Sequence, residues 1–359
     1  MERGVNMKIT FCLPSILKVP AGGFKIVYEY ANRLANRGHD VSIVFLTNTH
    51  FINWTNSLFI KNMLSQIKLI GYPNWFKLDN HIKKIATPYV DGRAFPEADV
   101  IVATSAFTST VVANLADSKG RKFYLIQGFE NWGMPDDEVI RTYKLGFSNI
   151  TIAKWLEVLV KEQANVDAKT ISNPIDISKF YVTEGINTRN PYEIAMLYHT
   201  GKHKGIDIAF KALDLVKKRI PELHVNLFGV YDIDTVLPTY VSYTQKATEK
   251  DLLRIYNNSS IFVCASEIEG FGLTGAESMA CGCALASTAY DGVFEYAKNE
   301  DNALLSPVND YTKLAYNIIR LIEDRELRIK LATKASYDIK KLSWDSAVDK
   351  LEKEFSKLS

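Results

Sequence analysis

The chain has 359 residues, of which 47% are hydrophobic and 23% are charged, and its formal net charge is +2. This length suits about two domains, and the composition excludes a wholly disordered chain. The small net charge gives no reason to expect nucleic acid as a partner.

Neither the start of the sequence nor its cysteines point to a membrane span or a metal site. The apolar run at residues 9–13 is too short for a signal-peptide core, and no stretch approaches the roughly 20 apolar residues that cross a bilayer. Cys281-Gly-Cys283 lacks a second ligand pair at zinc spacing. We therefore expect a cytoplasmic protein without a bound metal, in which the cysteines are small apolar fillers.

The first half alternates β-rich runs with helical patterns, which indicates parallel βαβ units. The predicted strands are residues 8–13, 40–46, 99–103, 122–126 and 149–152. The predicted helices run from a Gly22-Gly23 turn to Gly38 and over residues 108–116, 138–145 and 154–163.

After a polar, turn-rich boundary at residues 182–191, the alternation starts again. Strands are predicted at residues 193–198, 224–228, 260–264, 284–287 and 303–306. Helices are predicted at residues 206–219, 249–257, 274–281, 311–324, 326–341 and 344–358. The fold class is therefore α/β with two Rossmann-like lobes, and ligands bind at the carboxyl ends of strands in such sheets.

A basic and aromatic segment lies at residues 51–85. Its charged residues are Lys61, Lys68, Lys77, Lys83 and Lys84 against Asp79, and its apolar residues include Phe59, Leu64, Ile67, Trp75 and Phe76. One interpretation is a peripheral contact with a membrane surface or an anionic acceptor. The other is a solvated helical face over an ordinary core, and the sequence leaves both open.

A glycine loop follows the predicted strand that ends near Cys264. Gly270 and Gly272 let the backbone approach a ligand closely, and a helix that starts near Thr274 would direct N–H groups at a phosphate. Glu269 precedes this loop and Glu277 falls in the expected first turn. Thr274-Gly-Ala-Glu277 also matches a capping box, which would explain Glu277 but not Glu269.

These residues resemble the E-x7-E motif of glycosyltransferase family 4, the retaining enzymes with a GT-B fold. The likeness continues at Ala280-Cys-Gly-Cys283, Gly292-Val-Phe-Glu295, Asn302-Ala-Leu-Leu-Ser-Pro307, Lys204-Gly205-Ile-Asp207, Gly22-Gly23 and Asn173-Pro-Ile-Asp176 with Phe180. It implies two lobes that face each other across a cleft. We expect an acceptor-side lobe at residues 1–175, a nucleotide-sugar lobe at residues 176–342, and a C-terminal helix at residues 343–359 that packs back on the first lobe.

The resemblance also implies a role for each motif residue. Glu269 would contact the donor sugar and stabilise charge at the reacting centre, Glu277 would accept hydrogen bonds from the ribose, and Lys204 would neutralise the diphosphate. The implied donor-binding set is Gly22, Gly23, His199, Lys202, Lys204, Gly270, Phe271, Gly272, Leu273, Thr274 and Glu277.

The sequence departs from the family pattern at two places. Many relatives have a phosphate-binding Gly-Arg pair before the Lys-Gly turn, where this chain offers His199 or Lys202, neither of which has the fork of Arg; Lys202 is alternatively a plain surface residue. Many relatives also carry a first-lobe His near the acceptor. Here Glu130 would face the acceptor, or lie in a surface turn.

The resemblance therefore predicts a retaining glycosyltransferase that moves a sugar from a nucleotide-diphosphate donor, with UDP or dTDP as the nucleotide, to a hydroxyl of a saccharide or lipid-linked glycan. No cofactor or metal is expected, and the similarity points to bacterial cell-surface polysaccharide synthesis of rhamnosyltransferase-like type. The alternatives are a non-catalytic nucleotide-sugar binder and a two-domain NAD(P)-dependent oxidoreductase. The oxidoreductase lacks support because no G-x-G-x-x-G follows the first strand.

Overall fold

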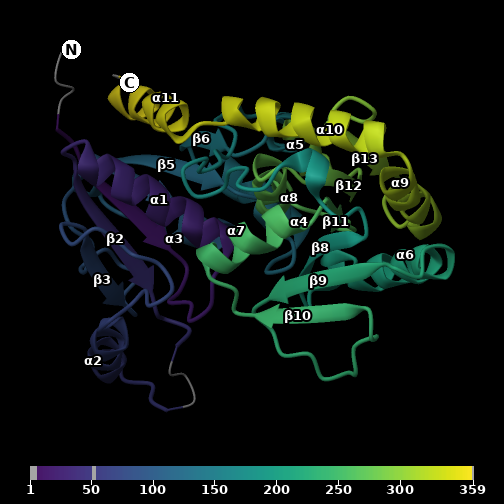
Figure 1. Ribbon diagram of the computed structural model, residues 1–359. Coiled ribbons are helices and arrows are strands. Elements are labelled where there is room, and N and C mark those ends of the chain that lie inside the picture. Colours follow the sequence, from purple (N-terminus) through teal and green to yellow (C-terminus); the bar gives the residue numbers. More distant parts are fainter. Residues whose placement is uncertain (1–5, 51–53, 358–359) are drawn as a thin grey trace. The chain divides into compact units, whose positions relative to one another are not determined.

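The computed structural model describes residues 6–50 and 54–357 and divides into two compact units (Figure 1). Unit 1 comprises Met1–Ser172 and Val348–Ser359, and unit 2 comprises Asn173–Ala347. The sequence-based boundaries, after residues 175 and 342, fall within a few residues of these divisions. No helix among the described residues is long and apolar enough to span a membrane.

Unit 1 is built on a parallel sheet of seven strands in the order β3-β2-β1-β4-β5-β6-β7. The strands are β1 (Lys8–Leu13), β2 (Asp40–Leu46), β3 (Lys83–Thr87), β4 (Val100–Ala103), β5 (Arg121–Ile126), β6 (Ser148–Thr151) and β7 (Ala168–Thr170). The helices are α1 (Gly22–Asn36), α2 (Leu58–Leu69), α3 (Ala106–Ala113), α4 (Asp136–Tyr143), α5 (Lys154–Ala164) and most of α11 (Trp344–Ser356).

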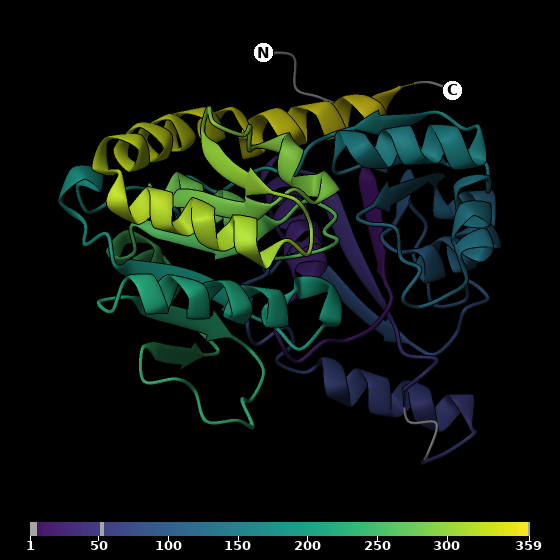
Figure 2. The ribbon, with the colours of Figure 1, turned by 90° about the vertical axis from the view of Figure 1, so that its right-hand side faces the viewer.

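Unit 2 has a parallel sheet of six strands in the order β10-β9-β8-β11-β12-β13. The strands are β8 (Glu193–Tyr198), β9 (His224–Gly229), β10 (Val241–Gln245), β11 (Ile261–Cys264), β12 (Ala284–Thr288) and β13 (Ala303–Ser306). The helices are α6 (Ile206–Arg219), α7 (Glu249–Asn258), α8 (Leu273–Ala280), α9 (Tyr311–Glu323) and α10 (Arg325–Asp338) (Figure 2).

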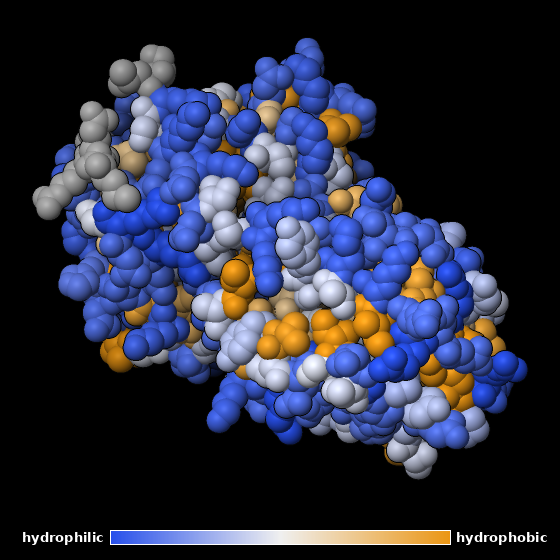
Figure 3. Space-filling model, turned by 45° about the horizontal axis from the view of Figure 1, so that its top comes forward, coloured by the Kyte–Doolittle hydropathy of each residue, from blue (hydrophilic) through white to orange (hydrophobic). Residues whose placement is uncertain are grey.

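The central strands are buried because helices cover the sheets, so their sequences are nearly continuous apolar runs. Phe11, Cys12 and Leu13 of β1 are at most 1% exposed, and β12 is buried throughout. The face seen in Figure 3 is accordingly mainly hydrophilic, with hydrophobic side chains in smaller groups.

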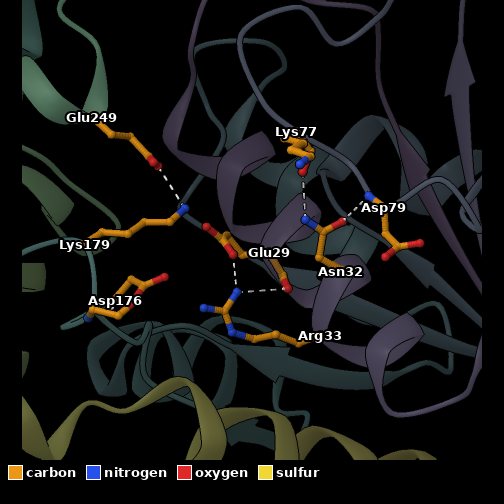
Figure 4. A network of polar contacts seen from close by, with 9 residues as sticks. Glu29, Asn32, Arg33, Lys77, Asp79, Asp176, Lys179 and Glu249 are labelled. Carbon is orange, nitrogen blue, oxygen red and sulfur yellow. Dashed lines mark hydrogen bonds and ion pairs between the residues drawn. The ribbon is translucent and has the colours of Figure 1, made fainter.

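Side-chain contacts fix several connecting segments to these cores (Figure 4). In unit 1, Asn32 of α1 donates to the carbonyl of Lys77 at 2.9 Å and accepts from the Asp79 N–H at 2.8 Å, which holds the loop before β3. In unit 2, Lys179 Nζ donates to Glu249 Oε1 at 3.0 Å.

The strand order places the ligand-binding edge of each unit. In both sheets the order reverses beside the first strand, between β1 and β4 and between β8 and β11. A crevice forms at the carboxyl ends of the strands at such a switch point, because the adjacent connections leave in opposite directions. The segments after β8 and β11 therefore meet at one edge of unit 2.

Candidate functional site

The Lys204 turn follows β8 and is held by a glycine that no other residue can replace without strain. Gly205 adopts a left-handed conformation with φ +60°, and a Cβ there would lie 1.9 Å from the carbonyl oxygen of Ala265. The Glu267 N–H also donates to the carbonyl of His203 at 2.7 Å. The backbones of the loops after β8 and β11 thus contact each other, which fixes the position of the Lys204 backbone.

Glu269 lies in the loop after β11 and pairs with Lys204. Lys204 Nζ donates to Glu269 Oε1 at 2.7 Å, and Ser266 Oγ donates to the same oxygen at 2.9 Å. Both charged side chains remain partly accessible, at 18% and 15% exposure. A pocket of about 10 Å³ lies beside them, and its lining includes Thr274.

The glycine loop and the start of α8 are packed tightly next to Glu269. Gly272 has φ +89° and caps α8, and a Cβ there would lie 2.2 Å from the hydroxyl of Tyr290. Gly292 is also closely packed, since a Cβ there would lie 2.7 Å from the carbonyl oxygen of Glu269. Phe271 is buried, with its ring 5.3 Å from that of Tyr296. The N-terminus of α8 is thereby held beside Glu269, where its N–H groups favour an anion.

The capping-box interpretation of Glu277 is wrong. The helix begins at Leu273 with Gly272 as its cap and has no side-chain cap, so Thr274 is already inside the helix. Glu277 therefore lies in the second turn rather than the first, and it is only 6% exposed. The expected helix start near Thr274 was one residue late, because a left-handed glycine cap leaves no Ser or Thr signal.

His199 and Lys202 differ sharply in their surroundings. Burial, followed by the positive charge of Lys204, lowers the pKa of His199 to about 4. The Gly201 N–H donates to His199 Nδ1 at 2.9 Å, and His199 Nε2 lies 3.3 Å from the hydroxyl of Tyr231. His199 is thus neutral at pH 7 and could bind a ligand by hydrogen bonds but not by charge. Lys202, by contrast, is exposed.

Unit 1 gathers polar groups at the carboxyl ends of its own strands. Helix α1 begins at Gly22 itself, so the expected Gly22-Gly23 turn is the first turn of a helix. A Cβ on Gly23 would lie 3.2 Å from the side chain of Gln127, whose Nε2 donates to the carbonyl of Thr104 at 3.2 Å. This arrangement brings the start of α1 beside the segments after β4 and β5.

Glu130 belongs to the same edge of unit 1. The Ala106 N–H at the start of α3 donates to Glu130 Oε2 at 2.9 Å, and burial raises the pKa of this carboxyl to about 7. Glu130 is thus a half-buried group that changes charge near neutral pH, which the sequence did not indicate.

The described residues, 6–50 and 54–357, contain no metal-binding group of side chains. No group of three or more His, Cys, Asp or Glu side chains in these ranges could hold a metal ion. All four cysteines are free thiols, and Cys12, Cys281 and Cys283 are buried.

Comparisons with known proteins agree with this architecture. Residues 184–337 match the family model for glycosyl transferases group 1. Phosphatidyl-myo-inositol mannosyltransferase of Mycolicibacterium smegmatis is 21% identical, and the match covers 94% of this chain and 90% of that protein.

Two solved structures extend the match over the whole chain. Sucrose-phosphate synthase from Thermosynechococcus elongatus superimposes with a TM-score of 0.77 at 15% identity, covering 98% of each chain. HepE of Anabaena, in complex with UDP and glucose, gives a TM-score of 0.75 at 17% identity, covering 98% of this chain and all of that one.

The two Rossmann-like units therefore define a GT-B fold. The family match itself is confined to residues 184–337, which lie in unit 2 and carry the Lys204 and Glu269 segments.

Proposed function

We propose that this chain is a retaining glycosyltransferase that moves a hexosyl or deoxyhexosyl unit from a nucleotide-diphosphate sugar to an acceptor hydroxyl. The observation that carries the proposal is the Lys204–Glu269 pair at the switch point of unit 2, beside the N-terminus of α8. A cation, a carboxylate and a helix N-terminus at one place suit the diphosphate and the sugar of such a donor.

The pair also explains how the donor would enter. Lys204 Nζ and Glu269 Oε1 share a hydrogen bond of 2.7 Å, so a donor that uses both groups must displace that contact. Lys204 would exchange the carboxylate for the diphosphate, and Glu269 would turn to the sugar hydroxyls. Charge that develops on the leaving phosphate would then be stabilised by Lys204 and by the α8 N–H groups.

The anomeric configuration of the sugar would be retained because the acceptor hydroxyl attacks from the same face that the diphosphate leaves. In this route a leaving phosphate oxygen takes the acceptor proton, so no dedicated base is required on unit 2. Because Lys204 and α8 supply the positive charge, we propose that the transfer needs no divalent cation or other cofactor.

UDP is the nucleotide that we propose first, with dTDP as the second choice. HepE, which shares the fold, was solved with UDP and glucose, and the buried Glu277 of α8 supplies a carboxylate for the ribose hydroxyls. These donors are made in the cytoplasm, where free cysteines such as those of this chain also persist.

The acceptor would be a saccharide or a lipid-linked glycan of a bacterial surface polysaccharide. The M. smegmatis relative is by name a transferase to a phosphatidyl-inositol, which favours a lipid-bearing acceptor here. Glu130 at the strand ends of unit 1 would face the acceptor hydroxyl, since it can hold or release a proton near neutral pH.

The test is Glu269→Gln, which keeps the size of the side chain and removes its charge. We expect transfer, and donor hydrolysis without acceptor, to fall at least about a hundredfold, because stabilisation of charge at the reacting centre is lost. Binding of UDP, measured by calorimetry, should persist.

The matched control is Glu267→Gln, an acid two residues away whose backbone rather than side chain ties the loops together. Undiminished transfer by Glu269→Gln would overturn the assignment of Glu269. A wild-type protein that binds UDP-sugars but neither transfers nor hydrolyses them would instead be a non-catalytic binding protein.

A further inference from the structure

Trp132 presents an indole ring to solvent at the carboxyl ends of the unit 1 strands. It lies in the loop of residues 127–135, between β5 and α4, and 74% of its surface is exposed. Single exposed hydrophobic residues are common on proteins, so what matters is how this ring is held and which groups lie beside it.

The loop holds the ring against its own backbone. The Gly133 N–H donates to the carbonyl of Glu130 at 3.2 Å, which closes a tight turn around Trp132. A Cβ on Gly128 would lie 3.4 Å from Cη2 of Trp132, so the outer edge of the ring folds back onto the buried Gly128. A ring that is already held at one edge loses little conformational freedom when a ligand packs on its exposed surface.

Glu130 supplies a polar group on the same turn. Its Oε2 accepts a hydrogen bond from the Ala106 N–H at 2.9 Å, and within residues 6–50 and 54–357 no lysine, arginine or histidine forms an ion pair with it. A carboxyl group has room for more hydrogen bonds than this one, and it can also donate when it is protonated. Glu130 therefore retains hydrogen-bonding capacity for a ligand beside Trp132.

The sequence around this turn is acidic. Asp136, Asp137 and Glu138 are exposed in the first turn of α4, and residues 127–140 contain no lysine, arginine or histidine. The next base along the chain, Arg141, is paired with Asp137. This charge disfavours a phosphate, a nucleotide or an anionic lipid, so the turn suits a neutral ligand.

A sugar ring combines the two properties that this turn can bind. Its C–H face is apolar and matches an aromatic surface, and the hydroxyls at its edge match a carboxyl group. A lipid chain would use the indole ring but leave the carboxyl group without a partner. A neutral saccharide uses both.

We infer that Trp132 and Glu130 form a subsite for a neutral sugar ring of the acceptor. The C–H face of that ring packs on the indole ring, and one of its hydroxyls forms a hydrogen bond with Glu130. This inference rests on the proposed function and deepens it, because the molecule that receives the transferred sugar is then itself a saccharide, whether or not a lipid carries it.

An array of immobilised oligosaccharides tests the inference. It carries neutral hexose and deoxyhexose oligomers beside the same oligomers with phosphate or uronic acid groups, and the full chain is applied with saturating UDP. Wild-type protein should bind neutral members more tightly than their anionic counterparts. Trp132→Ala should weaken this binding by at least about tenfold, and Trp132→Phe should keep most of it, because an aromatic surface remains. Glu130→Leu should weaken it by at least about threefold, because the hydrogen bond to the sugar is lost.

Trp54→Ala is the matched control, since Trp54 is a tryptophan of unit 1 with a similar exposed fraction of 77%. The two alanine variants should keep their unfolding midpoints and their affinity for UDP. Equal saccharide binding by wild type and Trp132→Ala, a preference for anionic members, or no binding by wild type would overturn the inference. So would a wild-type dimer in sedimentation velocity that Trp132→Ala abolishes, because the ring would then contact a second copy of the chain.

Donor hydrolysis separates this inference from the proposed function. A wild-type protein that hydrolyses UDP-sugars but binds no saccharide would overturn the subsite alone. A protein that binds saccharides through Trp132 but neither transfers nor hydrolyses a donor would overturn the proposed function and leave the subsite standing as a sugar-binding site.

Discussion

At the residue scale, the proposed donor site requires Lys204 to exchange Glu269 for the donor diphosphate. We expect Lys204→Gln to weaken UDP binding by at least about tenfold, because a charged hydrogen bond to the diphosphate is worth about 1.5–3 kcal/mol. Calorimetry with UDP measures this, and a chelator should leave the wild-type affinity unchanged.

Lys218→Gln is the control for this experiment, since Lys218 is an exposed lysine on α6 of the same unit. Lys202→Gln tests whether Lys202 takes the place of the phosphate-binding arginine that many relatives have. A loss of affinity equal to that of Lys204→Gln would assign Lys202 to the diphosphate. Unchanged UDP binding by Lys204→Gln would contradict the proposed donor site.

Glu130 makes the stability of unit 1 depend on pH. Its pKa is about 7 in the folded chain against an ordinary 4.5, so the fold favours the protonated form. That stabilisation is fully present below about pH 4.5 and is lost as the pH rises to about 7. The shift corresponds to about 3 kcal/mol as an upper limit, because the side chain is only half-buried.

Glu130→Gln should therefore remove most of this pH dependence. We expect the variant to be more stable than wild type by about 1–3 kcal/mol above pH 7 and nearly equal to it below pH 5. Urea unfolding at the two pH values measures the difference, with the exposed Glu138→Gln as control. A wild-type stability that does not fall between these pH values would show that Glu130 titrates normally.

At the element scale, the turn from β8 into α6 depends on one backbone contact. Gly205→Ala would place a methyl group against the carbonyl of Ala265, so we expect unfolding free energy to fall by about 2–4 kcal/mol and UDP binding to weaken. Gly71→Ala separates the effect of the close contact from the effect of the left-handed backbone, because Gly71 has a similar φ of +69° and nothing near its Cβ position. Equal losses in both variants would show that the close contact does not matter.

The elements that the sequence did not predict were missed for identifiable physical reasons. Helix α2, the edge strands β3, β7 and β10, and the cap of α8 all depart from the usual patterns. An edge strand is buried on less of its surface and needs fewer apolar residues. Helix α2 leaves Phe59, Met63 and Ile67 exposed, so its apolar residues do not mark a buried face. The central strands β1, β2 and β8 match the predicted ranges, and so does the edge strand β13, which is apolar and buried throughout.

At the scale of the whole molecule, the end of the chain completes the unit that contains its beginning. Phe355 of α11 is fully buried, with its ring 4.9 Å from that of Phe123 in β5. Arg37 donates to Asp349 at 2.6 Å and also to Glu352. The expected return of the C-terminal helix to the first lobe is thus a feature of the core of unit 1.

Phe355→Ala should lower the unfolding free energy of unit 1 by about 3–5 kcal/mol through the cavity that it creates. Calorimetric melting with and without UDP assigns the transitions, because a ligand raises the midpoint of the unit that binds it. The mutated unit should be the one that UDP does not stabilise. Tyr337→Ala, at an exposed aromatic, should change little; a loss confined to the UDP-sensitive transition would contradict this assignment.

The sequence by itself determined the alternation of strands and helices, the two units, and the spacing of Glu269 and Glu277, because periodicity and short motifs are local properties of the chain. Only the tertiary structure decided that Lys204 and Glu269, 65 residues apart, share a hydrogen bond. It also decided that Glu130 is half-buried and that Phe59, Met63 and Ile67 of α2 are exposed. These properties depend on which strands become neighbours, since the sheet order sets the distance, burial and dielectric surroundings of each side chain.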